Sequence, residues 1–366
     1  MSDQTPSSPV PPQVVPDSTA AKPPAPFLSF SPGEALARVV ELGGKPFHAR
    51  VIQRELFENG VLSYAAMTGL SKELRARLEA ELPLLSSSEK ERVESNDGTV
   101  KLLIELADGR TVETVHMPSF KKGKGATLCV STQVGCPVGC PFCASGLMGL
   151  DRNLEAHEIL EQYLHGRTLG PIARSVIMGI GEPLLNYPAL RTALERVNKD
   201  VGLGSRKVTV STVGFPERLR RIAPEKPPFQ LAISLHSPFD EERWELVPGM
   251  RGVTVEEILL AGDNWFEVTG REVTYEIVLL AGKNDTRSHA EALAKLLGQR
   301  RATVNLIPWN PILGSESDGK WCRPSTPEAD RFAEYLQENG IVATVRWSRG
   351  LGSDAACGQL RVRTSE

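Results

Sequence analysis

The sequence feature that most constrains the fold is a regular alternation of apolar strands and amphipathic helices that begins at Thr127. Apolar runs such as RSVIMGI, FQLAISLH and EVTYEIVLL are separated by segments with helical spacing near residues 155–166, 188–199, 254–267, 287–298 and 326–338. Strands that alternate with helices in this way form a parallel sheet covered by helices. The pattern predicts an α/β fold of about six or seven strand–helix units, open or closed into a barrel.

Short polar stretches follow several of the predicted strands. STQVGC, MGIGEP, STVG, SLH and PWNP each come directly after an apolar run. In barrels and in open parallel sheets, functional groups gather at the carboxyl ends of the strands. We therefore expect these five stretches to contribute to one site.

The composition changes three times before the alternating region. Residues 1–26 are rich in Pro and Ser and poor in large apolar residues, so we expect a disordered tail. Residues 27–95 carry apolar residues at three- and four-residue spacing and predict a helical accessory domain. Residues 96–122 contain two alternating runs around Asp108-Gly109 and predict a β-hairpin linker. The barrel is expected over residues 123–366.

Cysteine content and hydropathy indicate the compartment. Six cysteines in 366 residues are too few for a disulfide scaffold, and the N-terminus has no secretory pattern. No apolar run approaches the roughly 20 residues that span a bilayer. We expect a soluble cytoplasmic protein without a membrane partner.

The net charge of −3 gives no general argument for a nucleic-acid partner. Local positive clusters nevertheless occur, and those beside strand ends fit a phosphate-binding role. They comprise Lys121, Lys122 and Lys124; Arg206 and Lys207; Arg218, Arg220 and Arg221; and Arg300 and Arg301.

The stretch GCPVGCPFC places Cys136, Cys140 and Cys143 within eight residues, and no fourth cysteine or histidine follows within metal-binding distance. A structural zinc site needs four ligands, which would require a distant residue such as His157. Three thiolates also suit a four-iron cluster in which one iron keeps an open position for a substrate or cofactor.

This CxxxCxxC spacing, with Phe142 before the last cysteine, resembles the motif of radical S-adenosylmethionine enzymes. LCVSTQVGCPVGCPFC, MGIGEPLLNYPAL, RKVTVSTVG, AISLHSP, NLIPWNP and DAACGQL together resemble the RlmN/Cfr family of RNA adenine methyltransferases. The resemblance implies a partial (β/α)6 barrel. It also implies a [4Fe-4S] cluster on Cys136, Cys140 and Cys143, with one S-adenosylmethionine as methyl donor and a second as radical source in each turnover.

The resemblance assigns roles to three further residues. Cys357 in DAACGQL would carry the methyl group as S-methylcysteine, and a radical formed on that group would add to the adenine carbon. Cys129 would resolve the resulting protein–RNA adduct through a transient disulfide with Cys357. Glu113 would accept the ring proton. From the pattern alone, Cys129 could equally be a packing residue and Glu113 an exposed strand carboxylate.

The resemblance also implies a set of residues around S-adenosylmethionine. Backbone groups and short polar side chains at strand ends suit its amine, carboxylate and ribose. The residues are Gly181, Glu182, Ser211, Ser234, Leu235, His236 and Asn310.

The implied reaction is methylation of C2 of adenosine 2503 in 23S ribosomal RNA, with adenosine 37 of transfer RNA as a further substrate. The implied partners are 23S ribosomal RNA, transfer RNA and an electron donor such as flavodoxin or ferredoxin. The helical domain would bind RNA, and the protein would be a monomer. The alternatives are methylation at C8, radical chemistry on another substrate, and a zinc-stabilised RNA-binding module without catalysis.

Overall fold

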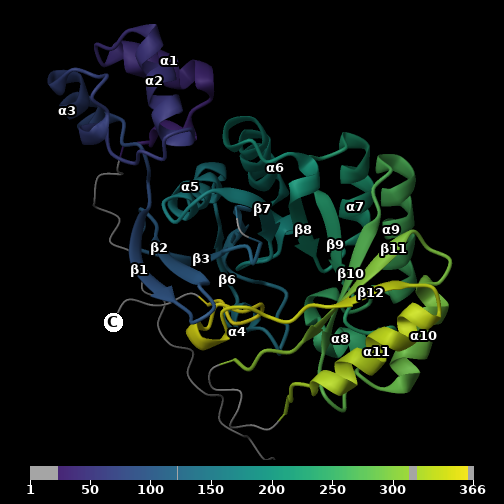
Figure 1. Ribbon diagram of the computed structural model, residues 1–366. Helices are drawn as coiled ribbons and strands as arrows, with labels where there is room; N and C mark the ends of the chain where they lie inside the picture. Colours follow the sequence, from purple (N-terminus) through teal and green to yellow (C-terminus); the bar gives the residue numbers. More distant parts are fainter. Residues whose placement is uncertain (1–23, 122, 313–319, 362–366) are drawn as a thin grey trace, which may run out of the picture.

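One mixed sheet organises the computed structural model, which describes residues 24–121, 123–312 and 320–361 (Figure 1). Within these ranges its strands follow the order β1-β2-β3-β4-β7-β8-β9-β10-β11-β12. The pairs from β1 to β4 are antiparallel, and those from β4 to β12 are parallel. The prediction of a parallel sheet is confirmed.

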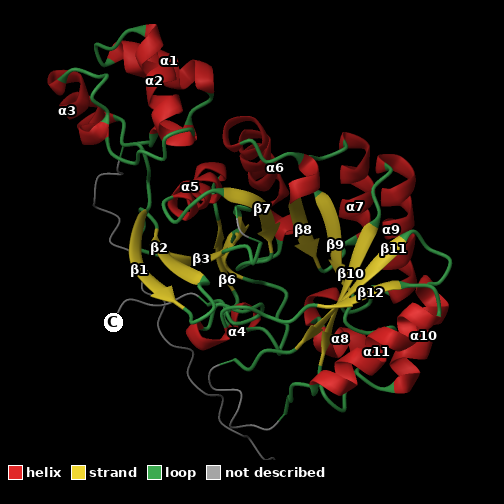
Figure 2. Cartoon of the chain, in the orientation of Figure 1, coloured by secondary structure: helices red, strands yellow, loops and turns green. Residues whose placement is uncertain are grey.

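Every crossover in the parallel part contains at least one helix, and the helices cover the outer face of the sheet (Figure 2). Among the described residues, β12 pairs only with β11, so the barrel stays open on one side. The strands are β4 (Ala126–Cys129), β7 (Ile172–Ile177), β8 (Val208–Thr212), β9 (Gln230–Ser234), β10 (Val273–Leu279), β11 (Ala302–Pro308) and β12 (Val342–Val345). The helices are α5 (Ala156–Arg167), α6 (Tyr187–Arg196), α7 (Pro216–Ile222), α8 (Asp240–Leu246), α9 (Val255–Thr269), α10 (Arg287–Leu297) and α11 (Thr326–Glu338).

Local sequence explains where the longer helices begin and end. Thr254 and Glu257 form a capping box at the start of α9, and Gly270 ends that helix at a φ of 69°. Ser325 and Glu328 form the same box at the start of α11. All five helices predicted after Thr127 are present. Most apolar residues of the strands and of the inner helix faces form one large core. A second, small cluster contains Val115, Cys129, Ile180, Ala355 and Leu360.

The predicted helices of the N-terminal region are also present, as α1 (Pro32–Glu41), α2 (Pro46–Phe57) and α3 (Lys72–Glu81). Most of the predicted tail, residues 1–23, lies outside the described residues. In the part of the chain that the structure describes, no helix combines the length and the apolar character needed to cross a bilayer.

The predicted hairpin is present as β2 (Val100–Glu105) and β3 (Thr111–Met117), but a third strand joins it. Residues 88–94, which the sequence analysis placed in the helical region, form β1 (Ser88–Glu94) and pair with β2. The segment SEKERVE carries no apolar alternation because this edge strand is exposed along nearly its whole length. The apolar periodicity of residues 88–94 therefore gives no indication of a strand.

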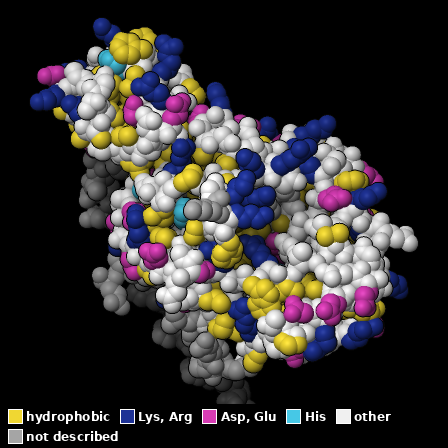
Figure 3. Space-filling view, in the orientation of Figure 1, with side chains coloured by type: hydrophobic (Ala, Val, Ile, Leu, Met, Phe, Trp, Pro, Cys, Tyr) yellow, Lys and Arg dark blue, Asp and Glu magenta, His cyan; other side chains and the backbone are white. Residues whose placement is uncertain are grey.

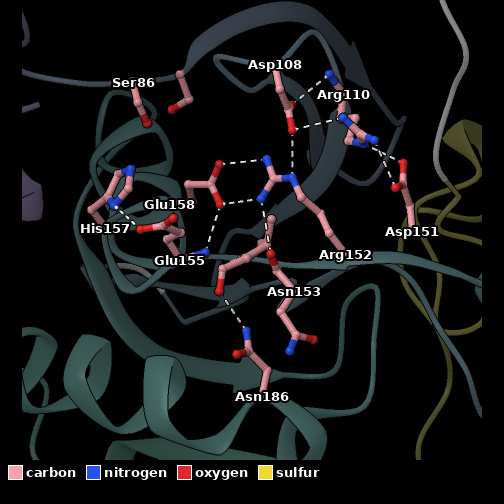
Figure 4. Close-up of polar contacts among 12 residues, drawn as sticks. Ser86, Asp108, Arg110, Asp151, Arg152, Asn153, Glu155, His157, Glu158 and Asn186 are labelled. Atoms are coloured by element: carbon pink, nitrogen blue, oxygen red, sulfur yellow. Dashed lines mark hydrogen bonds and ion pairs between the residues drawn. The ribbon is translucent and has the colours of Figure 1, made fainter. Parts of the chain in front are cut away.

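A network of ion pairs fastens the β2–β3 turn to the segment that follows the cysteine loop (Figure 4). Arg152 in β6 (Leu150–Asn153) makes two bonds of 2.8 Å to the carboxylate of Glu158 in α5, and its Nε lies 2.6 Å from Asp108. Arg110 binds Asp108 at 3.1 Å and also contacts Asp151. The hairpin is therefore held against the barrel by side chains as well as by the sheet.

Candidate active site

The loop with the three cysteines lies between β5 (Gln133–Gly135) and α4 (Ala144–Leu147). Gly135 starts the loop at a φ of 78°, and a Cβ there would lie 2.0 Å from the carbonyl oxygen of Gly149, so only glycine fits. The Cys136 amide donates to the same carbonyl at 2.8 Å, and the Cys143 amide donates to Cys140 at 3.2 Å. Backbone bonds thus fix the three cysteines relative to the sheet.

The three cysteines share a cavity of about 150 Å³, which we call the cysteine cavity. It lies at the carboxyl ends of the parallel strands, as predicted. Its wall includes Cys136, Cys140, Cys143, Gly181, Glu182, Ser211, Ser234, His236, Glu276 and Cys357. His157, the distant residue considered for a zinc site, instead lines a separate cavity beside η1 (Phe27–Ser29).

Burial dominates the electrostatics of the cysteines. It raises the pKa of Cys136 to about 12 and raises the pKa of Cys140 well above its usual value, with the neighbouring cysteines adding to the effect. Arg243 is completely buried, its charge opposes the shift at Cys140, and its Nη1 has no hydrogen-bond partner among the described residues. Thiols in such a place ionise when a cation replaces their protons. Three converging thiols beside an incompletely bonded guanidinium fit an iron-sulfur cluster.

The polar residues on the cavity wall are held by their own neighbours. The Glu182 carboxylate accepts from Thr212 Oγ1 at 2.6 Å and from the amides of Leu184 and Val213 at 2.9 Å. Its amide donates to Gln133 Oε1 at 2.7 Å, so internal bonds fix both the backbone and the side chain of Glu182. Ser211 and Ser234 face each other at 3.4 Å.

His236 adopts a φ of 64°, and burial lowers its pKa to about 3. Its Nδ1 accepts from the amide of Val278 at 3.2 Å. A neutral, fixed imidazole therefore closes this part of the cysteine cavity.

The structure does not bring Leu235 and Asn310 to the wall of the cysteine cavity. Leu235 is completely buried, and its amide donates to the carbonyl oxygen of Glu276. Asn310 Nδ2 donates to the carbonyl oxygen of Cys357 at 2.9 Å and to Ser348 at 2.8 Å. Asn310 therefore positions Cys357, because its amide is used within the protein.

A second, larger cavity of about 710 Å³ adjoins the first and is rich in cations; we call it the basic cavity. It extends from the amino ends of β7 and β8 to the carboxyl end of β11. Figure 3 shows Lys and Arg side chains gathered over the middle of this face. Its cationic residues are Lys121, Lys124, Arg174, Lys207, Arg346 and Arg349.

Two of the predicted positive clusters therefore contribute to this cavity, although Lys122 lies outside the described residues. The other two clusters each have an arginine that bonds within the protein. Arg218 donates to the carbonyl oxygen of Leu184, and Arg300 pairs with Asp263 at 3.0 Å.

Cys357 lies on the wall that separates the two cavities, because it lines both of them. Its side chain is exposed. The segment around it is tied to the cysteine loop: the amide of Ala144 donates to Gly358 at 2.8 Å, and Ser145 Oγ donates to Leu360 at 2.6 Å. A group carried on Cys357 can therefore be reached from either cavity.

Cys129 and Cys357 line the basic cavity together, and both are free thiols in this structure. Burial raises the pKa of Cys129 to about 12. Cys357 is open to the cavities, but the protein that surrounds it still removes much of its hydration, and this desolvation raises its pKa to about 11. Arg346 opposes both shifts with its positive charge and is itself paired electrostatically with the buried Glu276. Arg346 thus favours the thiolate form of both cysteines.

Glu113 is completely buried rather than exposed, and it lines neither cavity. Its carboxylate lies 3.1 Å from Lys101 Nζ and accepts from the amide of Arg361 at 2.9 Å. Lys101 also donates to the carbonyl oxygen of Asp354 at 3.0 Å. The pair therefore holds both ends of the segment that carries Cys357.

Two charged residues that face the thiols, Arg346 and Glu276, were not predicted from the sequence. Each had a signal in the sequence. Glu276 is the single acidic residue inside the apolar run VTYEIVLL, and Arg346 lies near the carboxyl end of the last apolar run, IVATVRW. A charge at either kind of position is costly unless it has a partner, so it indicates a site.

Three comparisons agree on the family. Residues 130–297 match the model of the radical SAM superfamily, and residues 29–83 match the model of the ribosomal RNA large subunit methyltransferase N-terminal domain. A protein of Nostoc punctiforme named "Probable dual-specificity RNA methyltransferase RlmN" is 42% identical over 92% of this chain and 93% of its own length. One of the same name from Rhodopirellula baltica is 41% identical over 93% and 91%. The crystal structure of a radical SAM methyltransferase from Sphaerobacter thermophilus superposes with a TM-score of 0.86 at 39% identity, covering 92% of this chain and 99% of that one.

Proposed function

Because the chain belongs to the RlmN family of radical SAM RNA methyltransferases, we propose that it methylates C2 of adenosine 2503 in 23S ribosomal RNA and of adenosine 37 in transfer RNA. Two features of the basic cavity support an RNA substrate. It is lined by cations suited to phosphates, and it has room for a base displaced from its stack.

The observation that carries this proposal is the position of Cys357 on the wall between the two cavities. A methyl carrier must meet the donor on one side and the acceptor on the other without leaving its place. The tethers to Ala144, Ser145 and Asn310 keep the backbone of this segment fixed while the thiol stays exposed. Such preorganisation is what group transfer between two bound partners requires.

As a radical SAM protein, the chain uses a [4Fe-4S] cluster and S-adenosylmethionine. When bound, these cofactors supply an electron, a methyl group and a source of radicals at the cysteine cavity. We propose that Cys136, Cys140 and Cys143 hold the cluster. We propose further that Gly181, Glu182, Ser211, Ser234 and His236 contact S-adenosylmethionine. Leu235 and Asn310 would act indirectly, through their hydrogen bonds to Glu276 and Cys357.

We assign Cys129 as the resolving thiol. Its place beside Cys357 in the basic cavity supports a transient disulfide, which would form as the product leaves. Arg346 would stabilise the thiolate that begins each cycle.

We propose Glu113 as the proton acceptor. It lies on β3, two residues before Val115, which is paired with Cys129, but the amide of Arg361 covers its carboxylate. Accepting a proton from the RNA base would require the segment that follows Cys357 to lift from Glu113.

For partners, we propose that α1–α3 bind RNA, that flavodoxin or ferredoxin delivers electrons, and that the protein acts as a monomer. We also propose a cytoplasmic location, because the proposed RNA substrates occur there.

The test is a methylation assay with anaerobically purified, cluster-loaded protein, a 23S ribosomal RNA fragment, S-adenosylmethionine and a reductant. Nucleoside mass spectrometry should find 2-methyladenosine at the target position. A product methylated at C8 would overturn the regiochemistry, and no methylated nucleoside from fully loaded protein would overturn the RNA substrate.

A further inference from the structure

Two aromatic side chains at the basic cavity are exposed to solvent without an evident folding reason. Phe120 is 85% exposed and Trp347 is 40% exposed, and both line this cavity. Large aromatic rings usually stabilise a fold by burial, so exposed rings gathered at one cavity indicate a binding surface. Phe120 lies on the loop after β3, and Trp347 lies on the loop after β12.

Each ring has an arginine over one face. The guanidinium of Arg349 lies 4.2 Å from the centroid of Phe120, and that of Arg323 lies 5.5 Å from the ring of Trp347. Cation–π contact with an arginine holds a ring in place and leaves its opposite face for another planar group. Each ring is therefore prepared to stack on one side.

The two arginines are themselves anchored. Arg349 binds the carbonyl oxygens of Pro118 and Asp97, the latter at 2.9 Å, and its Nε lies 3.4 Å from the Asp97 carboxylate. Arg323 donates to Asn310 Oδ1 at 2.8 Å, and the amide of Asn310 holds the backbone of Cys357. The Trp347 platform is thus connected to the segment that carries the reactive thiol.

The chemistry of this rim identifies its partner. Stacking faces next to cationic side chains are the combination by which proteins hold single-stranded nucleic acid, because bases stack on the rings and phosphates bind the cations. Lys121, Lys124 and Arg349 supply the cations beside Phe120. Paired RNA would keep its bases stacked within the helix and offer nothing to these rings.

We propose that Phe120 and Trp347 are stacking platforms for the two nucleotides that flank the adenosine entering the basic cavity. The ligand of this rim is therefore an unpaired RNA segment with a stackable base on each side of the target. The inference rests on the proposed function and adds to it the conformation of the RNA that is accepted.

The test is equilibrium binding of a fluorescein-labelled RNA hairpin whose unpaired loop holds one adenosine between two purines. Two further hairpins replace either the 5′ or the 3′ purine with an abasic ribose. The proteins are the cluster-loaded wild type, Phe120→Leu, Trp347→Leu and, as a matched control, Phe239→Leu. Phe239 is 43% exposed at the start of α8 and lines neither cavity.

We expect each platform variant to bind the intact hairpin at least about 5-fold more weakly, as the loss of one stacked base predicts. The wild type should lose a similar factor with each abasic hairpin. For each platform variant, the abasic hairpin that lacks the base stacked on that platform should bind as well as the intact hairpin. The hairpin with the other abasic site should bind that variant more weakly than the intact hairpin does. The Phe239→Leu protein should bind like the wild type.

Equal binding by the wild type and both platform variants would overturn the inference, as would losses that add for every combination of variant and abasic site. Both platform side chains are exposed, and the cluster absorbance and the melting temperature of each variant check its folding. Failure of the proposed function is distinguishable, because the wild type would then leave the intact hairpin and 23S ribosomal RNA unmethylated whatever the platforms do.

Discussion

The two cavities that meet at Cys357 are built in different ways. The cysteine cavity is small, about 150 Å³, and it is lined by residues at the carboxyl ends of successive parallel strands. The basic cavity is larger, about 710 Å³, and it combines loops after β3 and β12 with the amino ends of β7 and β8. Backbone bonds and buried carboxylates fix the first, whereas exposed cations and aromatic rings surround the second.

We infer from this difference that the cysteine cavity performs the chemistry and that the basic cavity selects the RNA. A cluster and its cofactor require fixed distances, which strand ends and a tight glycine turn provide. RNA requires a broad, charged and partly adjustable surface, which loops provide. Changes in one cavity should therefore leave the other intact, and Cys357 should be the point at which the two depend on each other.

The largest effect is expected from Cys140→Ala. Removing one of three thiols should prevent cluster binding and abolish methylation, while RNA affinity stays within about twofold of the wild type because phosphate contacts dominate binding. Iron content, methyltransferase activity and RNA binding measure the three quantities. A parallel loss of RNA affinity would contradict the independence of the two cavities.

Glu113→Gln should lower the rate of methylation by about 100-fold or more, the usual cost of losing a general base. Because the proposed mechanism forms the adduct before the proton is removed, the variant should accumulate RNA covalently joined to Cys357. Denaturing gels with labelled RNA measure this species.

Lys101→Met is the matched control, since it removes the cation from the same pair. If Glu113 only holds the segment 354–361 in place, both variants should lose adduct formation equally.

A change outside both cavities should alter stability alone. Glu161 in α5 is buried against Ser86 and Ser87, which lie between α3 and β1, and burial raises its pKa to about 7. The folded state then binds the extra proton, so this group makes unfolding easier as pH rises from about 4.5 to 7. Glu161→Gln should remove that dependence. In the wild type it should lower the free energy of unfolding by about 3 kcal/mol at pH 8 relative to pH 4.5.

Denaturant unfolding of the wild type and the variant across this pH range measures the difference. A constant difference in unfolding free energy would show that Glu161 titrates normally. Methylation and RNA binding at pH 8 should be unchanged.

The smallest effect is expected from Lys121→Gln combined with Lys124→Gln. Each lost phosphate contact should reduce the slope of log affinity against log salt by about 0.7 for single-stranded RNA. Fluorescence anisotropy at several salt concentrations measures the slope. Phe120→Leu should weaken binding but leave the salt slope unchanged, since stacking releases few counterions. An unchanged slope in the double lysine variant would show that Lys121 and Lys124 do not contact RNA phosphates.

Much of the fold could be predicted from the sequence because each parallel strand is a buried apolar run. Helix positions followed from periodicity and from caps such as Thr254 and Ser325. β1 could not be predicted, because an edge strand exposed to solvent needs no apolar alternation. The short α7 and α8 carry too few turns for a periodic signal.

The cysteine ligands could be predicted because they are close together in the chain. The roles of Asn310 and Glu113 were harder to predict, since the sequence indicates a polar residue near a strand end but not where its hydrogen bonds go. In the structure both residues hold the Cys357 segment. Phe120 and Trp347 gave no signal because their proximity depends on loops more than 220 residues apart.

The central claim is that Cys357 carries the methyl group from one cavity to the other. The most direct test loads the protein anaerobically with trideuteromethyl S-adenosylmethionine, removes the excess, and follows a single turnover with RNA and unlabelled S-adenosylmethionine. We predict a labelled methyl group on the Cys357 peptide before RNA is added and deuterium in the methyl group of the first RNA product. An unlabelled first product, or a Cys357 that never gains the methyl group, would contradict the account.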